Sequence, residues 1–155
     1  MAFTDKVIIF AATGAWTGKI PIAPGTFGTL VGILFVLGLD CIHPGLETLF
    51  VVGLIIFSIW VADRAEKILE QKDPSCVVID EIAGYVVTMV GVSLSIYTVL
   101  AGFVLFRFFD ILKPFPVKHF EEKFHGGAGI VLDDLMAGLL SAFFLRILIK
   151  FNILF

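Results

Sequence analysis

Residues 46–62 read LETLFVVGLIIFSIWVA, a stretch in which Glu47 is the only charged residue and which is followed by the charged pair Asp63 and Arg64. A helix that crosses a lipid bilayer needs about 20 predominantly apolar residues, and fewer when its polar end lies at the interface. The stretch therefore predicts a membrane-spanning helix, and it is the clearest one in the chain.

The rest of the chain has the same apolar character. Of its 155 residues, 59% are hydrophobic and 16% are charged, against roughly 45–50% and about 25% in soluble domains. We therefore expect a single membrane-embedded domain over residues 1–155, with the lipid bilayer as its main solvent. The net charge is −3 and there is no basic run, so no nucleic-acid partner is expected. The first residues show no clear small-residue cleavage site, so we expect no cleaved signal.

Five apolar runs separated by turn signals predict an all-α, polytopic bundle of about five spans: 26–39, 46–62, 77–92, 97–112 and 130–149. The first run is the shortest. About fourteen helical residues cover only about 21 Å of a hydrocarbon core roughly 30 Å thick. The first span is therefore tilted, extended or re-entrant.

Basic residues gather in two of the connections: Arg64, Lys67 and Lys72 after the second run, and Lys113, Lys118 and Lys123 after the fourth. The connections 40–45 and 91–96 contain none. Because cytoplasmic loops collect lysine and arginine, loops 63–76 and 113–129 are predicted to be cytoplasmic, together with the amino terminus. Arg146 and Lys150 run against this rule, and we interpret them as side chains that snorkel to the far interface.

Cys41 and Cys76, the only cysteines, are predicted to lie near opposite membrane faces, too far apart for a disulfide. We interpret both as packing residues. Neither begins a Cys-x5-Arg loop, because Glu47 and Ile82 stand at the sixth positions after them. This excludes a thiolate phosphatase mechanism.

Carboxylates fall at the predicted cytoplasmic ends of the runs: Asp63, Asp80, Glu81, Asp110, Asp133 and Asp134. Ionisable groups at a membrane boundary are costly unless they are paired, hydrated or metal-bound. A cluster of oxygen ligands favours Mg²⁺ or Mn²⁺. The sequence therefore predicts an acidic metal site at the cytoplasmic end of the bundle.

Simpler roles are open to several of these acids when each is taken alone. Asp80 and Asp133 stand at predicted helix starts, where a carboxylate caps free amides. Asp110 follows Arg107 by three positions, so an alternative role for it is an ion pair with Arg107 on one helical face. The alternative for Asp63 is an ordinary interfacial residue.

Capping does not account for the doubled acids. Glu81 and Asp134 lie one position deeper, and small residues follow both pairs at 83–84 and 137–138. Small residues let membrane helices approach closely, which would bring the two pairs together. We therefore predict that the metal ligands are Asp80, Glu81, Asp133 and Asp134.

Groups suited to a phosphate surround these acids. Arg107 and Lys113 flank Asp110, and residues 23–29, APGTFGT, supply glycines and the hydroxyls of Thr26 and Thr29 at a helix start, where free amides favour anions. The alternatives are a tight turn with close packing for the glycines and an interfacial anchor for Lys113. Three further glycines, at 126, 127 and 129, are predicted to form a flexible entry that presents Asp133.

Four motifs in order carry a family resemblance: APGTFGTL at 23–30, DPSCVVIDEIAG at 73–84, FRFFDILKPFPV at 106–117 and GGAGIVLDDLMAG at 126–138. Together they resemble the phosphatidylglycerophosphatase A family of bacterial membrane lipid phosphatases. The resemblance implies Mg²⁺-dependent removal of the terminal phosphate of phosphatidylglycerophosphate, which leaves phosphatidylglycerol, at the cytoplasmic face of the inner membrane. It also implies a catalytic role for the following residues: Asp80, Glu81, Arg107, Asp110, Lys113, Asp133 and Asp134.

The substrate is then a membrane phospholipid that reaches the site laterally from the cytoplasmic leaflet. A carboxylate outside the metal shell serves as general base, or an aspartate forms a phosphoaspartate intermediate, and the residues leave this choice open. The main alternative is a small ion or metal transporter with an acidic binding site. Transport predicts polar residues and broken helices near mid-membrane, whereas the acids here gather at one end.

Overall fold

The computed structural model describes residues 2–115, 117 and 124–153. The predictions for Lys118 and Lys123 lie outside this part of the chain. The regular elements are α1 (Phe3–Ala12), a 3-10 turn η1 (Thr17–Lys19), α2 (Pro24–Leu39), α3 (Pro44–Leu69), α4 (Ile79–Met89), α5 (Ile96–Leu112) and α7 (Gly126–Lys150). The described residues contain no strand, so the predicted all-helical fold is confirmed.

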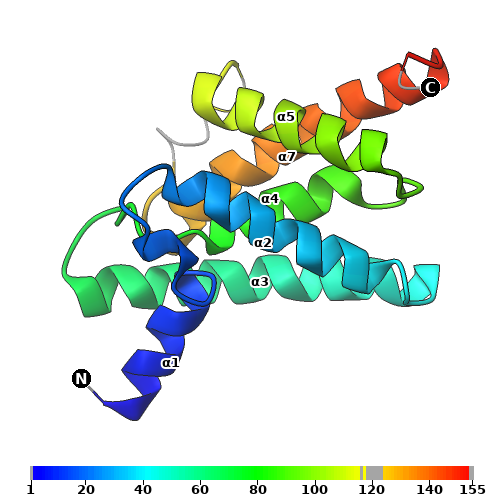
Figure 1. Ribbon diagram of the computed structural model, residues 1–155. Coiled ribbons are helices and arrows are strands. Elements are labelled where there is room, and N and C mark those ends of the chain that lie inside the picture. Colours follow the sequence, from blue (N-terminus) through cyan, green and yellow to red (C-terminus); the bar gives the residue numbers. More distant parts are fainter. Residues whose placement is uncertain (1, 116, 118–123, 154–155) are drawn as a thin grey trace.

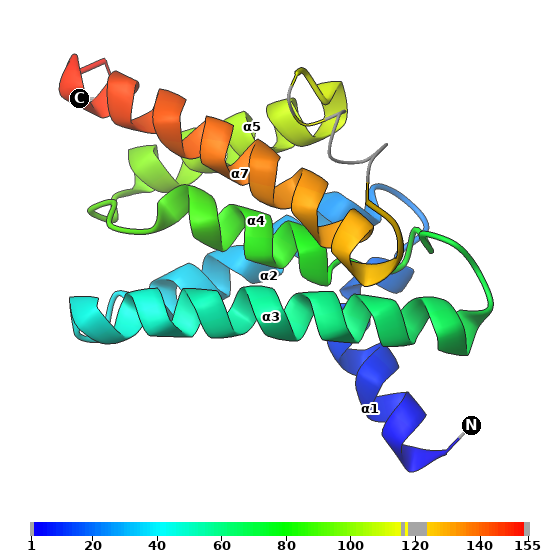
Figure 2. The ribbon, with the colours of Figure 1, turned by 180° about the vertical axis from the view of Figure 1, so that it is seen from behind.

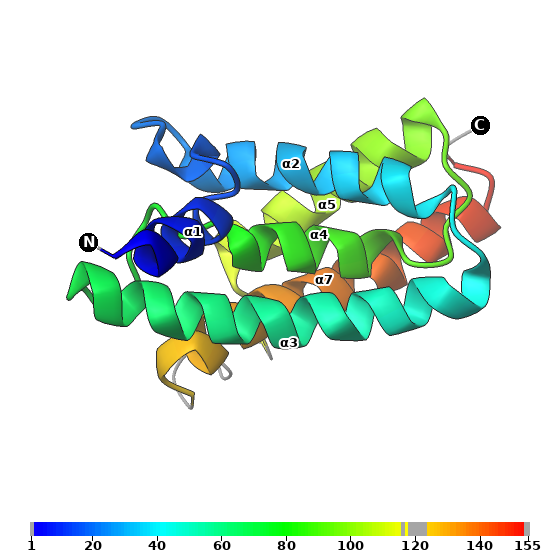
Figure 3. The ribbon, with the colours of Figure 1, turned by 90° about the horizontal axis from the view of Figure 1, so that it is seen from below.

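Helix α4 lies at the centre of the bundle, with α2, α3, α5 and α7 around it (Figures 1, 2 and 3). Nine of its 11 residues are buried. At 1.5 Å per residue it is about 16 Å long, roughly half of a hydrocarbon core. The predicted span 77–92 is therefore wrong in extent, because the helix is a short core element inside a longer apolar run.

Local contacts explain why α4 is short. Val78 is not helical, and its N–H donates a hydrogen bond of 2.8 Å to the carbonyl oxygen of Ala12. Beyond the other end of the helix, Gly91 has a φ of +64°. This left-handed conformation is easy for glycine and cannot continue a helix.

Helices α3 and α7 are longer than predicted. Helix α3 continues past Ala62 to Leu69, because residues 64–67 are good helix formers and Lys67 pairs with Asp63 one turn before it (2.6 Å). Residues 63–69, predicted as loop, are therefore helical. Helices α2 and α5 follow the predicted runs within two residues at each end.

The glycines at 126, 127 and 129 belong to α7, and Gly126 at its first position has a φ of +66°. The predicted flexibility of this segment stays a prediction. The role of these glycines is close packing, as Gly127 shows. A side-chain carbon on Gly127 would collide with the backbone of Ile59 and Asp63 on α3. The absence of side chains thus lets α7 lie directly on α3.

The amino-terminal segment, to which the sequence assigned no role, is part of the core. Thr13 is fully buried, and its hydroxyl donates to the Ile9 carbonyl at 2.7 Å. Gly18 lies against the carbonyl of Cys76. Together with the hydrogen bond between Ala12 and Val78, these contacts fix the segment that leads into α4, while α1 leaves the bundle obliquely (Figures 1 and 2).

The chain runs from one end of the bundle to the other in α2, α3, α4, α5 and α7, so its connections gather at two ends (Figure 1). At the end where α4 finishes, the Gly91 N–H donates to Glu47 Oε1 at 3.1 Å. Arg146 lies at this end too, where it donates to the Val90 carbonyl at 2.6 Å. Cys41 is exposed here, so its interpretation as a packing residue is wrong, and Cys76 lies at the end where α4 begins.

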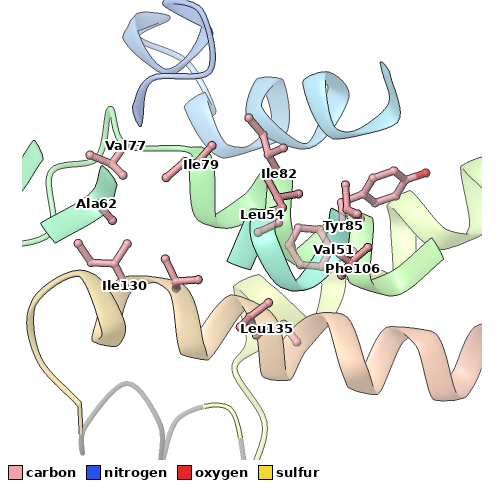
Figure 4. Packing of buried hydrophobic residues seen from close by; sticks show 14 of the residues in the cluster. Val51, Leu54, Ala62, Val77, Ile79, Ile82, Tyr85, Phe106, Ile130 and Leu135 are labelled. Carbon is pink, nitrogen blue, oxygen red and sulfur yellow. The ribbon is translucent and has the colours of Figure 1, made fainter. Parts of the chain in front are cut away.

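Apolar side chains fill the core around α4, where Tyr85 and Phe106 pack with their rings 6.3 Å apart (Figure 4). Other apolar side chains lie on the outer surface of the bundle. Those that are at least 60% exposed include Leu34, Leu49, Ile56, Val104 and Phe143. Within the part of the chain that the structure describes, two helical stretches of 25 residues are long and apolar enough to cross a membrane, Gly45–Leu69 and Gly126–Lys150. By the same measure α2 is a shorter apolar helix.

Candidate active site

Three carboxylates from two helices converge at the end where α4 begins. Asp80 and Glu81 lie in the first turn of α4, and Asp134 lies on α7. One oxygen of each lies within 4.8 Å of the others. We call Asp80, Glu81 and Asp134 the carboxylate triad.

The predicted close approach of α4 and α7 brings the triad together. Gly84 and Gly138 lie one turn after Asp80 and Asp134, and a side-chain carbon on Gly138 would collide with the Gly84 carbonyl. The Thr88 hydroxyl lies 3.0 Å from that carbonyl oxygen and 3.4 Å from the Gly138 carbonyl oxygen. The two backbones therefore touch directly below the acids.

The capping alternative fails for the acids of α7. The helix begins at Gly126, so Asp133 and Asp134 lie about two turns inside it. Asp80 and Glu81 do lie in a first turn, where they suit the helix dipole, but no side chain caps α4. Asp134 in particular needs another explanation for its burial, since only 4% of it is exposed.

Each carboxylate of the triad has one buried oxygen that finds no hydrogen-bond partner in the described residues: Asp80 Oδ1, Glu81 Oε2 and Asp134 Oδ2. Buried polar atoms are normally satisfied, and a buried negative charge without a partner is strongly unfavourable. A hard divalent cation takes carboxylate oxygens as ligands and would satisfy all three. The donor set therefore fits Mg²⁺ or Mn²⁺.

Arg107 lies beside the triad on α5. Its guanidinium donates to Asp110 Oδ2 at 2.5 Å and lies 3.9 Å from Glu81 Oε1. The structure thus shows the pairing of Asp110 with Arg107 along one helical face that was the alternative to a metal-binding role for Asp110. Asp110 holds the arginine and lies outside the triad.

Lys113 follows α5 with a φ of +43° and reaches across to α7. Its ammonium group donates to Asp133 Oδ2 at 2.8 Å. The structure therefore places Asp133 against a lysine and outside the triad, and its role as a metal ligand stays a prediction. Asp63 is also separate, because it pairs with Lys67 on an exposed part of α3.

An open pocket of about 690 Å³ joins these groups. It is lined by the triad, Arg107, Asp110, Lys113 and Asp133, and by Pro24 and Gly25 at the start of α2. Thr26 and Thr29, predicted to bind substrate, do not line it. The Thr29 hydroxyl is buried and donates to the Gly25 carbonyl within its own helix at 2.8 Å. The substrate contact of Thr26 and Thr29 stays a prediction.

The same pocket has lining residues that were not predicted to belong to the site. They come from the last part of α3, from the connection after it and from the position before α7: Glu66, Lys72, Asp73, Ser75 and His125. Glu66 Oε1 accepts a hydrogen bond of 2.9 Å from the Asp73 N–H, which fixes the turn. Asp73 opens one of the four motifs, so its position in the motif was the available signal.

The fold and the pocket together define a class: an all-helical protein whose carboxylates suit a hard cation and stand beside two cationic side chains, as a phosphate-processing centre requires. A family model described as phosphatidylglycerophosphatase A matches residues 10–149. The chain belongs to the phosphatidylglycerophosphatase A family, and it is therefore a phosphatase, a phosphoric monoester hydrolase.

Individual relatives agree with the family match. Phosphatidylglycerophosphatase A of Haemophilus influenzae is 37% identical over 83% of this chain and 80% of its own length. The protein of that name from Escherichia coli is 35% identical over 84% of this chain and 77% of its own length. A protein of Bacteroides thetaiotaomicron with the provisional name phosphatidylinositol-3-phosphatase is 34% identical over 86% of this chain and 87% of its own length. No solved structure matches the chain.

Proposed function

We propose that this chain hydrolyses the terminal phosphate of phosphatidylglycerophosphate to give phosphatidylglycerol, and that the reaction requires Mg²⁺. The names of two relatives support the substrate. The observation that carries the metal requirement is the carboxylate triad, whose three buried oxygens have no hydrogen-bond partner in the described residues. A transporter role is not favoured, because the family is one of phosphatases.

In this proposal, Asp80, Glu81 and Asp134 hold the cation. Bound Mg²⁺ supplies positive charge that polarises the phosphoryl oxygens and activates water. Arg107 donates two parallel hydrogen bonds to the phosphoryl oxygens, and its contact with Asp110 keeps the guanidinium oriented.

Lys113 adds a second positive charge at the pocket, where Asp133 holds it in place. Two carboxylates outside the triad, Asp110 and Asp133, are the candidates for the general base. Both line the pocket that receives the phosphate.

We further propose that the chain is a multi-pass protein of the cytoplasmic (inner) membrane and forms one domain. The proposal keeps the predicted topology, in which the short helix α4 is shielded by its neighbours and the exposed apolar side chains face lipid. The pocket then lies at the cytoplasmic interface, where Arg64, Lys72 and Lys113 satisfy the positive-inside rule. A phospholipid headgroup lies at that depth, so the substrate enters from the cytoplasmic leaflet.

Phosphate release from lipid phosphates tests the activity. The purified full chain should release phosphate from phosphatidylglycerophosphate faster than from phosphatidylinositol 3-phosphate or phosphatidic acid. The activity should fall to background in EDTA and return with excess Mg²⁺, because the single Arg107 guanidinium beside Glu81 does not offset the charge of three carboxylates. Equal rates with and without EDTA would overturn the metal requirement. A faster rate on phosphatidylinositol 3-phosphate would instead make that lipid the substrate, as the name of the Bacteroides relative indicates for that protein.

Cysteine labelling tests the orientation. Native Cys41 and a Gln71→Cys variant probe opposite ends of the bundle, and both positions are exposed. In intact spheroplasts a membrane-impermeant maleimide should label Cys41 in a Cys76→Ser background. The Gln71→Cys variant, made without the native cysteines, should be labelled only after lysis. The reverse pattern would place the pocket on the outer face and remove the cytoplasmic leaflet as the source of substrate.

A further inference from the structure

Gly25, the second residue of α2, lies directly against two functional groups of the pocket. A side-chain carbon on Gly25 would collide with Glu81 Oε1 and would lie 2.9 and 3.1 Å from the two terminal nitrogens of Arg107. Those two side chains belong to different parts of the proposed site, one to the carboxylate triad and the other to the phosphate contact.

Backbone conformation does not explain a glycine at this position. Gly25 is helical and is not among the residues with positive φ. Glycine is a poorer helix former than alanine because it loses more conformational freedom on folding, so backbone conformation alone would favour alanine in α2. What glycine provides here is bare backbone, against which the tips of Glu81 and Arg107 pack.

The contact orients the Glu81 carboxylate. Oε1 faces Gly25 and Arg107, whereas Oε2 is the buried oxygen without a hydrogen-bond partner in the described part of the chain. Because the two oxygens are rigidly joined, any displacement of Oε1 also moves Oε2 relative to Asp80 and Asp134. A displacement of the Arg107 guanidinium would likewise change its alignment with a phosphate.

We propose that Gly25 is a positioning residue that acts through Glu81 and Arg107 at once, so that the start of α2 sets both the cation site and the phosphate contact. This inference rests on the proposed function. It predicts that the Gly25→Ala variant is impaired both in cation binding and in the phosphate contact. A change in the triad should impair cation binding alone, and a change in Arg107 should impair the phosphate contact alone.

Three glycines of α2 separate positioning from folding. The neighbours of Gly25 are the ends of flexible side chains, which move without disturbing the fold. A side-chain carbon on Gly28 would instead lie 2.6 Å from Val78 Cβ and 3.1 Å from its carbonyl oxygen, close to backbone that anchors α4. Gly38 has nothing within 4 Å of that position.

The test measures Mn²⁺ binding by the purified chain, thermal unfolding, and KM for the lipid. Gly25→Ala should unfold near the wild-type temperature, bind Mn²⁺ about tenfold more weakly and show a raised KM, as expected when groups that orient ligands are displaced. Gly28→Ala should lower the unfolding temperature and leave the Mn²⁺ affinity of the folded protein unchanged. Gly38→Ala should match the wild type in binding and KM.

A rescue experiment separates displacement of Glu81 from general damage. Glu81→Asp shortens the side chain by one methylene and should weaken Mn²⁺ binding on its own. In the Gly25→Ala background, the same change makes room for the new methyl group and should restore part of the affinity. Unchanged Mn²⁺ affinity and KM in Gly25→Ala, or a defect that Glu81→Asp only deepens, would overturn the inference.

The Mn²⁺ measurement also distinguishes this inference from the proposed function. A wild-type chain that binds Mn²⁺ and hydrolyses no lipid phosphate would overturn the function, while the binding data would still decide the role of Gly25. A wild-type chain that binds no Mn²⁺ would overturn the positioning role.

Discussion

Asp134→Asn should lower phosphate release by at least about 100-fold at the Mg²⁺ concentration that half-saturates the wild type. The residue is 4% exposed, and its Oδ2 has no hydrogen-bond partner in the described residues. Asparagine keeps the shape but removes the charge that a divalent cation needs. A Mg²⁺ titration of the rate should therefore show a higher requirement, or no activity at any concentration.

The same variant should fold at least as well as the wild type when metal is absent, because one of three neighbouring negative charges has been removed. Lost activity with unchanged or raised thermal stability is typical of a functional site and not of a structural carboxylate. Asp40→Asn, at the opposite end of the bundle, is the matched control and should have no effect on the rate. The triad would have to be abandoned if Asp134→Asn kept full activity at limiting Mg²⁺.

Arg107→Lys should lower kcat/KM on the order of 100-fold and leave the Mg²⁺ requirement unchanged. Lysine keeps the positive charge but loses the planar fork that donates two hydrogen bonds to a phosphate. The variant also loses the oriented contact with Asp110, which holds the guanidinium at 2.5 Å in the wild type. Steady-state rates measured over a range of lipid concentrations, at several Mg²⁺ concentrations, separate a change in kcat/KM from a change in the Mg²⁺ requirement.

Arg146→Lys is the control for the arginine variant. Arg146 bonds carbonyls of Val90 and Ala142 far from the pocket, so its replacement should affect stability more than turnover. A change in Mg²⁺ requirement as large for Arg107→Lys as for Asp134→Asn would contradict the proposed division of labour. The arginine would then act mainly on the carboxylates.

The sequence predicted the helical class and the family more reliably than the extent of each helix. Apolar runs gave the positions of α2 and α5 within two residues. They failed for α3, because the charged residues after Ala62 end the apolar run, although residues 64–67 are good helix formers. They failed for α4 as well, because Val77 and Val78 are apolar and yet not helical, and Val78 is held by a hydrogen bond to Ala12 that no local pattern reveals.

The contacts within the site also depended on packing between distant segments. Spacing along a helix was enough to anticipate the pair of Arg107 with Asp110, three residues apart. The pair of Lys113 with Asp133 joins two helices across the pocket, and the choice of Asp134 over its neighbour for the triad depends on how α7 is rotated against α4. Gly25, Glu66 and Asp73 reach the pocket from elements whose positions only the assembled bundle defines.

By itself, the sequence determined what each segment is made of: apolar runs for a helical bundle, paired carboxylates that resist explanation as caps, and motifs that identify the family. The tertiary structure alone decided which of these groups meet. The physical reason is that residue type and helical periodicity are local properties, whereas the distance between two carboxylates on different helices is set by backbone contacts such as that of Gly84 with Gly138.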